Sequence, residues 1–178
     1  MQTTPSQVAA RRLLIVWWSM TGATRQLADA AATGAGEAVA GSDGQPVEIA
    51  RLRADRAGPG DVLAASALLV ATPENLASMA GMTKDFFDRC WYPVLDRVNG
   101  RPFAAIVCAG SDGQGTIRQL ERFATGWRLR AVAPPLLVLT HAQTPEAILA
   151  PKTITPGDRA RAAELGATLA AGLSLGLW

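Results

Sequence analysis

Five short apolar runs alternate with helical patterns, and this alternation is the feature that most constrains the fold. Each run is about the length of a strand and rich in Val, Ile or Leu, and three of them are nearly continuous, as in parallel strands covered on both faces. The runs are Leu13–Trp18, Val47–Leu52, Ala67–Ala71, Phe103–Ala109 and Val132–Leu139. Repeated strand–helix units predict an α/β fold of three layers, with a doubly wound five-stranded parallel sheet.

Two common strand orders fit such a sheet, and five strands favour the order 2-1-3-4-5. The run Val47–Leu52 includes Glu48 and Arg51, which suits an edge strand. In sheets of this order a ligand binds outside the carboxyl ends of the strands, where the winding direction reverses. Three loops are therefore of interest, those after the first, third and fourth strands.

The helical patterns lie between the apolar runs. Thr155-Pro156 is a start signal, with Thr as N-cap and Pro at the first helical position, for a helix to about Leu173. Pro93 is expected to stop the helix over Thr83–Trp91. The remaining helices are expected at Thr24–Ala40, at Gly60–Ser66 (shorter), and where Ile117, Leu120, Ala124 and Trp127 form a stripe.

Length and composition limit the class of protein. The 178 residues fit one domain over 1–178, and 49% hydrophobic residues are enough for a full core. A net charge of +2 without a basic face gives no indication of nucleic-acid binding. Cys90 and Cys108 are expected to be buried, reduced thiols, and with a single histidine they form no metal site.

No membrane segment is predicted. Met1–Ala10 is polar and has no signal pattern, and the uncharged run Leu165–Trp178 falls short of the roughly 20 residues that span a bilayer. We interpret that run as a core-facing helix and tail. The sequence therefore predicts a cytoplasmic protein.

The loop after the first strand carries the strongest functional signal. It reads Ser19-Met20-Thr21-Gly22-Ala23-Thr24 and leads directly into a helix. The N-terminus of a helix offers free N–H groups and partial positive charge to an anion such as phosphate. Gly22 allows a tight backbone curve, and the hydroxyls can add donors. An ordinary turn capped by Ser and Thr is the alternative.

Other phosphate motifs fit this loop less well. A Walker A loop requires G-K-[ST] and the dinucleotide fingerprint requires G-x-G-x-x-G, and the loop contains neither. The six residues instead resemble the flavodoxin phosphate loop, [TS]-x-T-G-x-T, at every fixed position. That resemblance implies a flavodoxin-like fold in which Ser19, Met20, Thr21, Gly22, Ala23 and Thr24 wrap the phosphate of FMN.

The loop after the third strand resembles one particular group of flavoproteins. Thr72, Pro73, Gly81, Lys84, Phe86 and Asp88 match the pattern of flavin-dependent NAD(P)H oxidoreductases, a group that includes NADPH-dependent FMN reductases and quinone reductases. The resemblance implies that Thr72, Pro73, Glu74, Asn75 and Leu76 lie beside the flavin ring.

This loop lacks the Trp or Tyr that stacks on the ring in electron-carrier flavodoxins. Leu76 and Met79 are the only large apolar candidates, and the alternative is that both simply pack on the sheet. A less covered ring leaves room for a nicotinamide or a quinone, which favours an enzyme.

The loop after the fourth strand is rich in glycine, which allows the backbone to approach a flat ligand. By the same resemblance it lies around the pyrimidine side of the ring, through Gly110, Ser111, Asp112 and Gly115. The alternative is a plain strand-to-helix turn capped by Thr116.

Three other features carry less weight. The run Gly172–Gly176 matches G-x-S-x-G, but it lacks a following helix and a later histidine, as a nucleophile elbow requires. His141 follows the fifth strand and is expected at the surface, although it could approach the site. Trp91-Tyr92-Pro93 is expected to be a half-buried turn, with a subunit or substrate contact as the alternative.

The leading hypothesis is an FMN-dependent NAD(P)H oxidoreductase that reduces a quinone, a free flavin or a similar acceptor. NADH or NADPH is the expected donor, and no side chain is assigned a catalytic role because the chemistry belongs to the cofactor. A flavodoxin-type electron carrier is the first alternative, although carriers are typically acidic and this sequence has a pI near 8.8. A flavin-free interaction protein is the second. Family resemblance also implies a homodimer or homotetramer.

Overall fold

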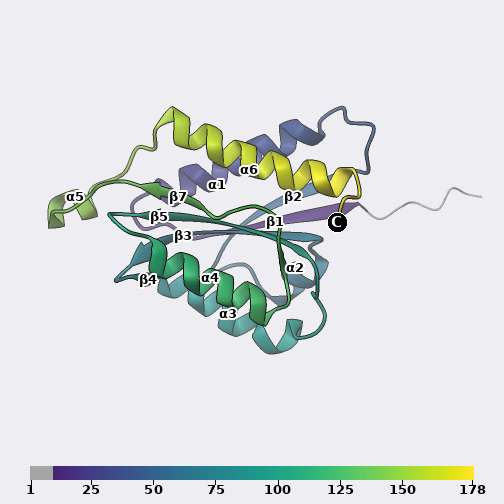
Figure 1. The fold of residues 1–178 in the computed structure, drawn as a ribbon, viewed down its shortest axis with the longest axis horizontal. Helices are drawn as coiled ribbons and strands as arrows, with labels where there is room; N and C mark the ends of the chain where they lie inside the picture. The colour runs from purple at the N-terminus through teal and green to yellow at the C-terminus, as the bar shows by residue number, and fades with distance from the viewer. Residues whose placement is uncertain (1–9) are drawn as a thin grey trace, which may run out of the picture.

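The computed structural model describes residues 10–178, so the predictions for Met1–Ala9 lie outside the described residues. Figure 1 shows a central sheet with helices above and below it. The elements in chain order are β1 Arg11–Trp17, α1 Ala23–Val39, β2 Val47–Arg53, α2 Pro59–Ala64, β3 Ala67–Asn75, β4 Ser78–Met79, α3 Gly81–Val94, β5 Pro102–Ala109, α4 Gln114–Gly126, β6 Arg130–Ala131, β7 Leu136–Leu139, α5 Pro145–Leu149 and α6 Pro156–Ser174.

The sheet is parallel along the order β2-β1-β3-β5, and both β6 and β7 pair with β5 in the fifth place. This confirms the predicted order 2-1-3-4-5 and the edge position of the second strand. The predicted fifth strand Val132–Leu139 is wrong in its first half, because Pro134 and Pro135 have no N–H to donate to β5. Pairing resumes at Leu136, opposite Ile106.

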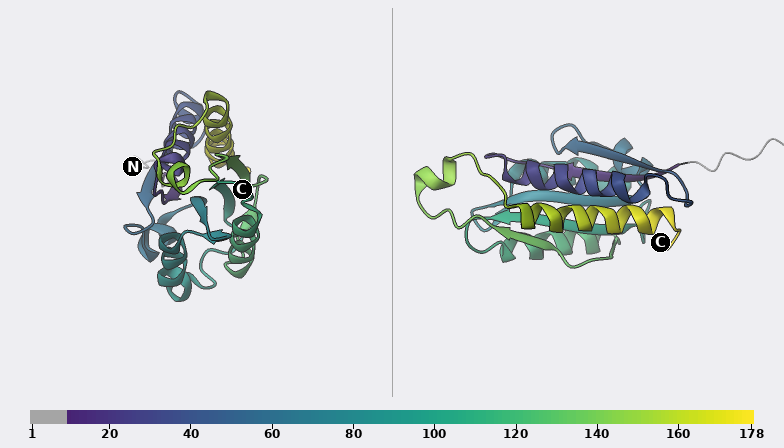
Figure 2. Two further views of the ribbon diagram at one scale, coloured as in Figure 1. Left: turned by 90° about the vertical axis from the view of Figure 1, so that its left-hand side faces the viewer. Right: turned by 90° about the horizontal axis from the view of Figure 1, so that it is seen from above.

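Two layers of helices cover the sheet, α1 and α6 on one face and α2, α3 and α4 on the other (Figures 1 and 2). The buried side chains of the strands alternate between these two cores: Leu13 and Ile15 face α1 and α6, whereas Leu14 and Val16 face the other layer. Because both faces are covered, the central strands are almost continuously apolar, as their sequence indicates.

The helix signals were accurate at most ends. Thr155 is the N-cap of α6, its side chain accepts a hydrogen bond from the Asp158 N–H, and the helix ends at Ser174. The helix predicted over Thr83–Trp91 is too short, and Pro93 does not stop it, since α3 includes Pro93 and continues to the fully buried Val94. Tyr92 is exposed on the last turn of this helix, so the half-buried turn predicted there is also wrong.

Three elements were not predicted, namely β4, α5 and the two-residue strand β6. β4 pairs antiparallel with the end of β3, and the turn between them is Leu76-Ala77, both with positive φ (50° and 56°). Such turns normally carry Asn or Gly, so the sequence gives no hairpin signal there. α5 begins at Pro145 after the N-cap Thr144, whose side chain accepts from the Ala147 N–H.

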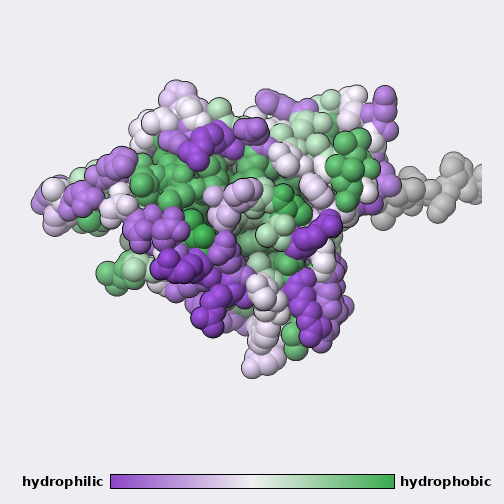
Figure 3. Space-filling model, in the orientation of Figure 1, coloured by the Kyte–Doolittle hydropathy of each residue, from purple (hydrophilic) through white to green (hydrophobic). Residues whose placement is uncertain are grey.

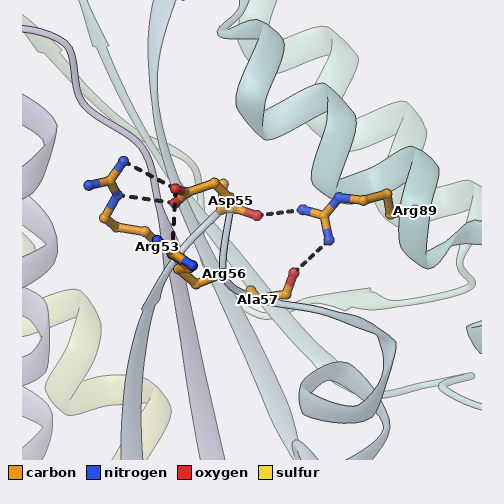
Figure 4. Close-up of polar contacts among 6 residues, drawn as sticks. Arg53, Asp55, Arg56, Ala57 and Arg89 are labelled. Carbon is orange, nitrogen blue, oxygen red and sulfur yellow. Dashed lines mark hydrogen bonds and ion pairs between the residues drawn. The ribbon is translucent and has the colours of Figure 1, made fainter.

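The turn between β2 and α2 is held by α3, which lies in the same helix layer as α2 (Figure 4). Arg89 of α3 donates hydrogen bonds to the backbone oxygens of Ala54 (2.6 Å) and Ala57 (2.9 Å). Within the turn, Asp55 accepts two hydrogen bonds from Arg53, at 3.1 and 3.2 Å. This turn lies beside the end of β1, since the Ala54 N–H donates to the Trp17 oxygen.

Several predictions about single residues are confirmed. Cys90 and Cys108 are free and buried, and His141 is exposed. The run from Leu165 onward forms the core-facing end of α6. Within residues 10–178, no helix has the length and apolar character needed to cross a membrane.

Candidate functional site

A cavity of about 550 Å³ lies where the carboxyl ends of β1, β3, β5 and β7 meet. This is the edge at which the sheet order predicts a ligand, and the volume falls in the range of about 300–1,000 Å³ that is common for small-molecule sites. Of the predicted cofactor-binding residues, eleven line the cavity: Ser19, Met20, Thr21, Ala23, Thr24, Pro73, Glu74, Asn75, Leu76, Gly110 and Ser111. The three predicted loops are thus brought together.

The first loop forms an N-terminus of α1 that no side chain caps. The N-cap is Gly22 in the left-handed conformation (φ 88°), where the missing Cβ avoids strain. Ser19 Oγ accepts a hydrogen bond from the Gly22 N–H inside the loop (3.0 Å) and so stabilises the curve before the helix. The capped-turn alternative is therefore not what the structure shows, since neither Ser nor Thr caps this helix.

Thr24, in the first turn of α1, is fully buried and lines the cavity. Its hydroxyl oxygen has no hydrogen-bond partner within residues 10–178. A buried hydroxyl without a partner is costly, and a ligand atom or a water in the cavity would satisfy it. An uncapped helix N-terminus and an unpartnered hydroxyl fit a phosphate group.

The loops after β3 and β5 are locked to each other. The Glu74 carboxylate accepts hydrogen bonds from the N–H groups of Gly113 (2.8 Å) and Thr116 (3.2 Å) and from the Thr116 hydroxyl (3.0 Å). Glu74 therefore caps α4 from across the site, and the predicted cap by Thr116 itself is wrong, because Gly113 is the N-cap. Gln119 adds a second connection by accepting from the Met79 N–H (2.9 Å).

Four predicted residues do not line the cavity but lie next to residues that do. Gly22 shapes the first loop, and Asp112 is exposed. Thr72 is buried and accepts hydrogen bonds from the Ala80 N–H and the Thr83 hydroxyl, so it fixes the loop after β3 from behind. Gly115 allows α4 to approach that loop, since a Cβ there would lie 2.3 Å from the Ala77 oxygen.

Sequence reasoning missed one wall of the cavity. The additional lining residues come from the ends of β5 and β7, from the tip after β3 and from the segment around α5: Ala77, Cys108, Ala109, Thr140, Ala142, Ile148, Leu149 and Lys152. Thr140 follows the fifth strand at the same sheet edge, so the strand order could have indicated it. Thr144-Pro145 repeats the start signal of α6 and could have revealed α5.

Few charged side chains line the cavity. Of the described residues, two charged side chains line the cavity, Glu74 and Lys152, and both are already engaged. Lys152 Nζ donates to the backbone oxygens of Ile148 (2.9 Å) and Ala150 (2.7 Å) at the end of α5. Burial raises the pKa of the Cys108 thiol from 9.0 to about 11, so it stays protonated at neutral pH.

A family model for NADPH-dependent FMN reductase matches residues 18–144. The chain belongs to this family. The match includes all three loops of the cavity and confirms the resemblance seen in their sequences. The family and the fold together support an FMN-binding flavoprotein of the oxidoreductase class.

Solved structures agree on the fold. A flavodoxin from the domain Archaea is 16% identical with a TM-score of 0.70, and the alignment covers 91% of this chain and 98% of that one. A flavodoxin, WrbA-like protein from Agrobacterium tumefaciens is 18% identical with a TM-score of 0.68, covering 92% and 98%. An oxidoreductase from Corynebacterium diphtheriae is 22% identical with a TM-score of 0.65, covering 91% and 97%. A comparison with curated proteins gave no match.

Proposed function

We propose that the chain binds one FMN in this cavity and uses it to pass electrons from NADH or NADPH to a small acceptor such as a quinone or a free flavin. The observation that carries the proposal is the uncapped N-terminus of α1 with the buried, unpartnered hydroxyl of Thr24. A ligand phosphate satisfies both features at once, since it accepts hydrogen bonds and complements the helix dipole. Family membership supports the donor.

The phosphate end of the site consists of the first loop. The hydroxyls of Ser19, Thr21 and Thr24 and the backbone N–H groups that open α1 would hold the phosphate without a lysine. The Thr21 carbonyl is already occupied, because it accepts from the Lys152 N–H (2.9 Å). The loop is thus fixed before a ligand binds, which lowers the ordering cost of binding.

The ring end of the site consists of the loops after β3 and β5. Pro73–Leu76 and Gly110-Ser111 would lie along the ring, and the Glu74 carboxylate fixes the spacing between the two loops. None of the described residues that line the cavity is aromatic. One face of a ring held there would stay open to a nicotinamide or to the acceptor.

When bound, FMN would supply the hydride chemistry between a nicotinamide and the acceptor. The chain binds and orients the ring, and no side chain is assigned as a general acid or base. His141 is exposed and outside the lining residues, and the Cys108 thiol is protonated at neutral pH.

The first experiment is the visible spectrum of the purified protein after FMN addition and desalting, repeated with FAD. Retained and perturbed flavin bands are expected with FMN. Steady-state oxidation of NADH and NADPH is then followed with quinones and with free flavins. Turnover above that of free FMN supports the enzyme. Bound FMN without such turnover identifies an electron carrier instead, and loss of both flavins on desalting overturns the proposal altogether.

A further inference from the structure

Helix α5 lines the cavity but belongs to neither core. It lies in the connection between β7 and α6, has no buried residue, and projects from the end of the molecule where the strands have their carboxyl ends (Figures 1 and 2). Ile148 and Leu149 are 51% and 71% exposed, yet both line the cavity. Five residues are too few for a stable isolated helix, so α5 depends on what it contacts.

The base of α5 is anchored to the phosphate loop. The Lys152 N–H donates to the Thr21 oxygen (2.9 Å), and the Gln26 side-chain amide donates to the oxygens of Lys152 (2.7 Å) and Gly22 (3.0 Å). Lys152 Nζ in turn holds the carbonyl end of α5. A single residue therefore joins the helix to the loop proposed for the phosphate, and it sets where Ile148 and Leu149 lie.

Among the described residues, the opposite wall, which the loop after β3 forms, has no aromatic side chain. Met79 is buried in the core beneath the helix layer of α3, whereas Leu76 is fully exposed at the tip of the β3–β4 turn. Figure 3 shows this turn as a hydrophobic projection at the lower left of the molecule. Of the two sequence candidates for covering the ring, Met79 packs in the core, and Leu76 lines the cavity only from the exposed tip of the turn.

We propose that Ile148 and Leu149 of α5 pack on the flavin ring, in place of the aromatic side chain that the loop after β3 lacks. The inference rests on the proposed function, since it requires FMN in the cavity. Both side chains lose exposed apolar surface when they pack on a ring, which favours binding and orders α5. Lys152 connects α5 to the loop proposed for the phosphate. A single FMN would therefore contact α5 through its ring and that loop through its phosphate.

The test compares two double variants with matched exposure. Ile148→Ser with Leu149→Ser removes the apolar surface of α5. Leu175→Ser with Leu177→Ser is the control, since these leucines are 68% and 63% exposed and lie at the far end of α6. FMN affinity is measured by quenching of flavin fluorescence. The α5 variant is expected to bind FMN at least about tenfold more weakly, and the control to bind as the native chain does.

A second measurement follows α5 directly. Hydrogen exchange at the amides of residues 146–150 is expected to slow when FMN is added to the native chain, and not in the α5 variant. If the native chain binds FMN but both variants bind it equally and exchange in α5 is unchanged, the inference is overturned and the proposed function stands. If the native chain does not bind FMN, the proposed function itself fails.

Discussion

The two helix layers pack on the same sheet by different means. On one face, α1 and α6 meet through small residues: a Cβ added to Gly34 would lie 2.2 Å from the Ala163 oxygen, and one added to Gly166 would lie 2.0 Å from the Ala31 oxygen. On the other face, aromatic rings fill the space between α3 and α4, with centroids 5.0 to 6.1 Å apart; they are Phe86, Phe87, Phe123 and Trp127.

This difference matches the two ends of the candidate site. The loop proposed for the phosphate opens α1, so the close backbone packing of α1 against α6 fixes the position of that loop. The loops proposed for the ring lead into α3 and α4, whose positions depend on side-chain volume. Glu74 and Gln119 add hydrogen bonds between these two loops. One end of the site is set by backbone contact and the other by side chains, so substitutions on the two faces should fail in different ways.

The largest loss of stability is expected from Phe86→Ala. Phe86 is fully buried and contacts both Phe87 and Trp127, so truncation leaves a cavity and should lower the free energy of unfolding by about 3–5 kcal/mol. Urea unfolding measures the effect. Tyr92→Ala on the same helix, at an exposed position, is the control and should change stability by less than about 0.5 kcal/mol. Equal losses in both would show that the aromatic cluster does not support this layer.

On the face that α1 and α6 cover, adding a single methyl group is expected to lower the stability of the chain. Gly166→Ala places its Cβ against the Ala31 backbone, which cannot move without separating α1 from α6, and should cost about 1–3 kcal/mol. Gly36→Ala in α1 is the matched control, because nothing lies within 4 Å of the added Cβ, and it should stabilise the helix by about 0.4–1 kcal/mol. The opposite signs are read from thermal or urea unfolding. A neutral Gly166→Ala would contradict the close-packing account.

The third comparison separates binding from folding. Thr24→Val removes a hydroxyl that has no partner, so stability of the ligand-free chain should be unchanged or slightly higher. FMN affinity should fall by about tenfold or more, since a hydrogen bond to a charged group contributes about 1.5–3 kcal/mol.

Thr83→Val on the other face is the counterpart. Its hydroxyl donates to Thr72 Oγ1 (2.9 Å) in the core, so this change should cost about 1 kcal/mol of stability and lower FMN affinity less than Thr24→Val does, because it reaches the ring only through Thr72 and the loop after β3. Both variants are examined by urea unfolding and by flavin titration. The assignment of Thr24 to the phosphate would be wrong if the two threonines gave the same pattern.

The sequence predicted what depends on local patterns and on the general rules for α/β sheets. The edge position of β2 and the N-cap at Thr155 follow from composition and turn chemistry. The strand order and the choice of the three loops follow from the rules for doubly wound sheets of five strands. The close approach of α1 and α6 is less visible in sequence, because the glycines at 34 and 166 matter only through what lies across from them.

The parts of the site that the sequence did not predict depend on contacts between residues far apart in the chain. Glu74 caps a helix that begins about forty residues later, which no local signal encodes. The Leu76-Ala77 turn takes positive φ angles that neither residue type favours, so the hairpin depends on the contacts around it. Lys152 is far from the first loop in sequence, and only the fold brings its N–H to the Thr21 oxygen.

The smallest expected effect concerns the reactivity of the two thiols, one of which lies in each core. Cys90 lies in the aromatic core and Cys108 in the small-residue core, where it also lines the cavity. Burial raises the pKa of each from 9.0 to about 11. Both thiols should therefore react slowly with iodoacetamide at pH 8, and about tenfold faster per pH unit below pH 11, as the thiolate fraction grows. The same shifts predict that stability present below pH 9 is lost as the pH rises from 9 to 11.

Added FMN is expected to change the alkylation rate of one thiol and not of the other. A ligand in the cavity covers Cys108 and leaves Cys90 untouched, so added FMN should slow alkylation of Cys108 severalfold and that of Cys90 not at all. Mass spectrometry of the labelled peptides measures both rates in one sample, with Cys90 as the internal control. Equal protection of both would mean that FMN acts by stabilising the whole chain rather than by occupying this cavity. Protection of Cys108 alone would place the ligand on the side of the sheet where α1 begins.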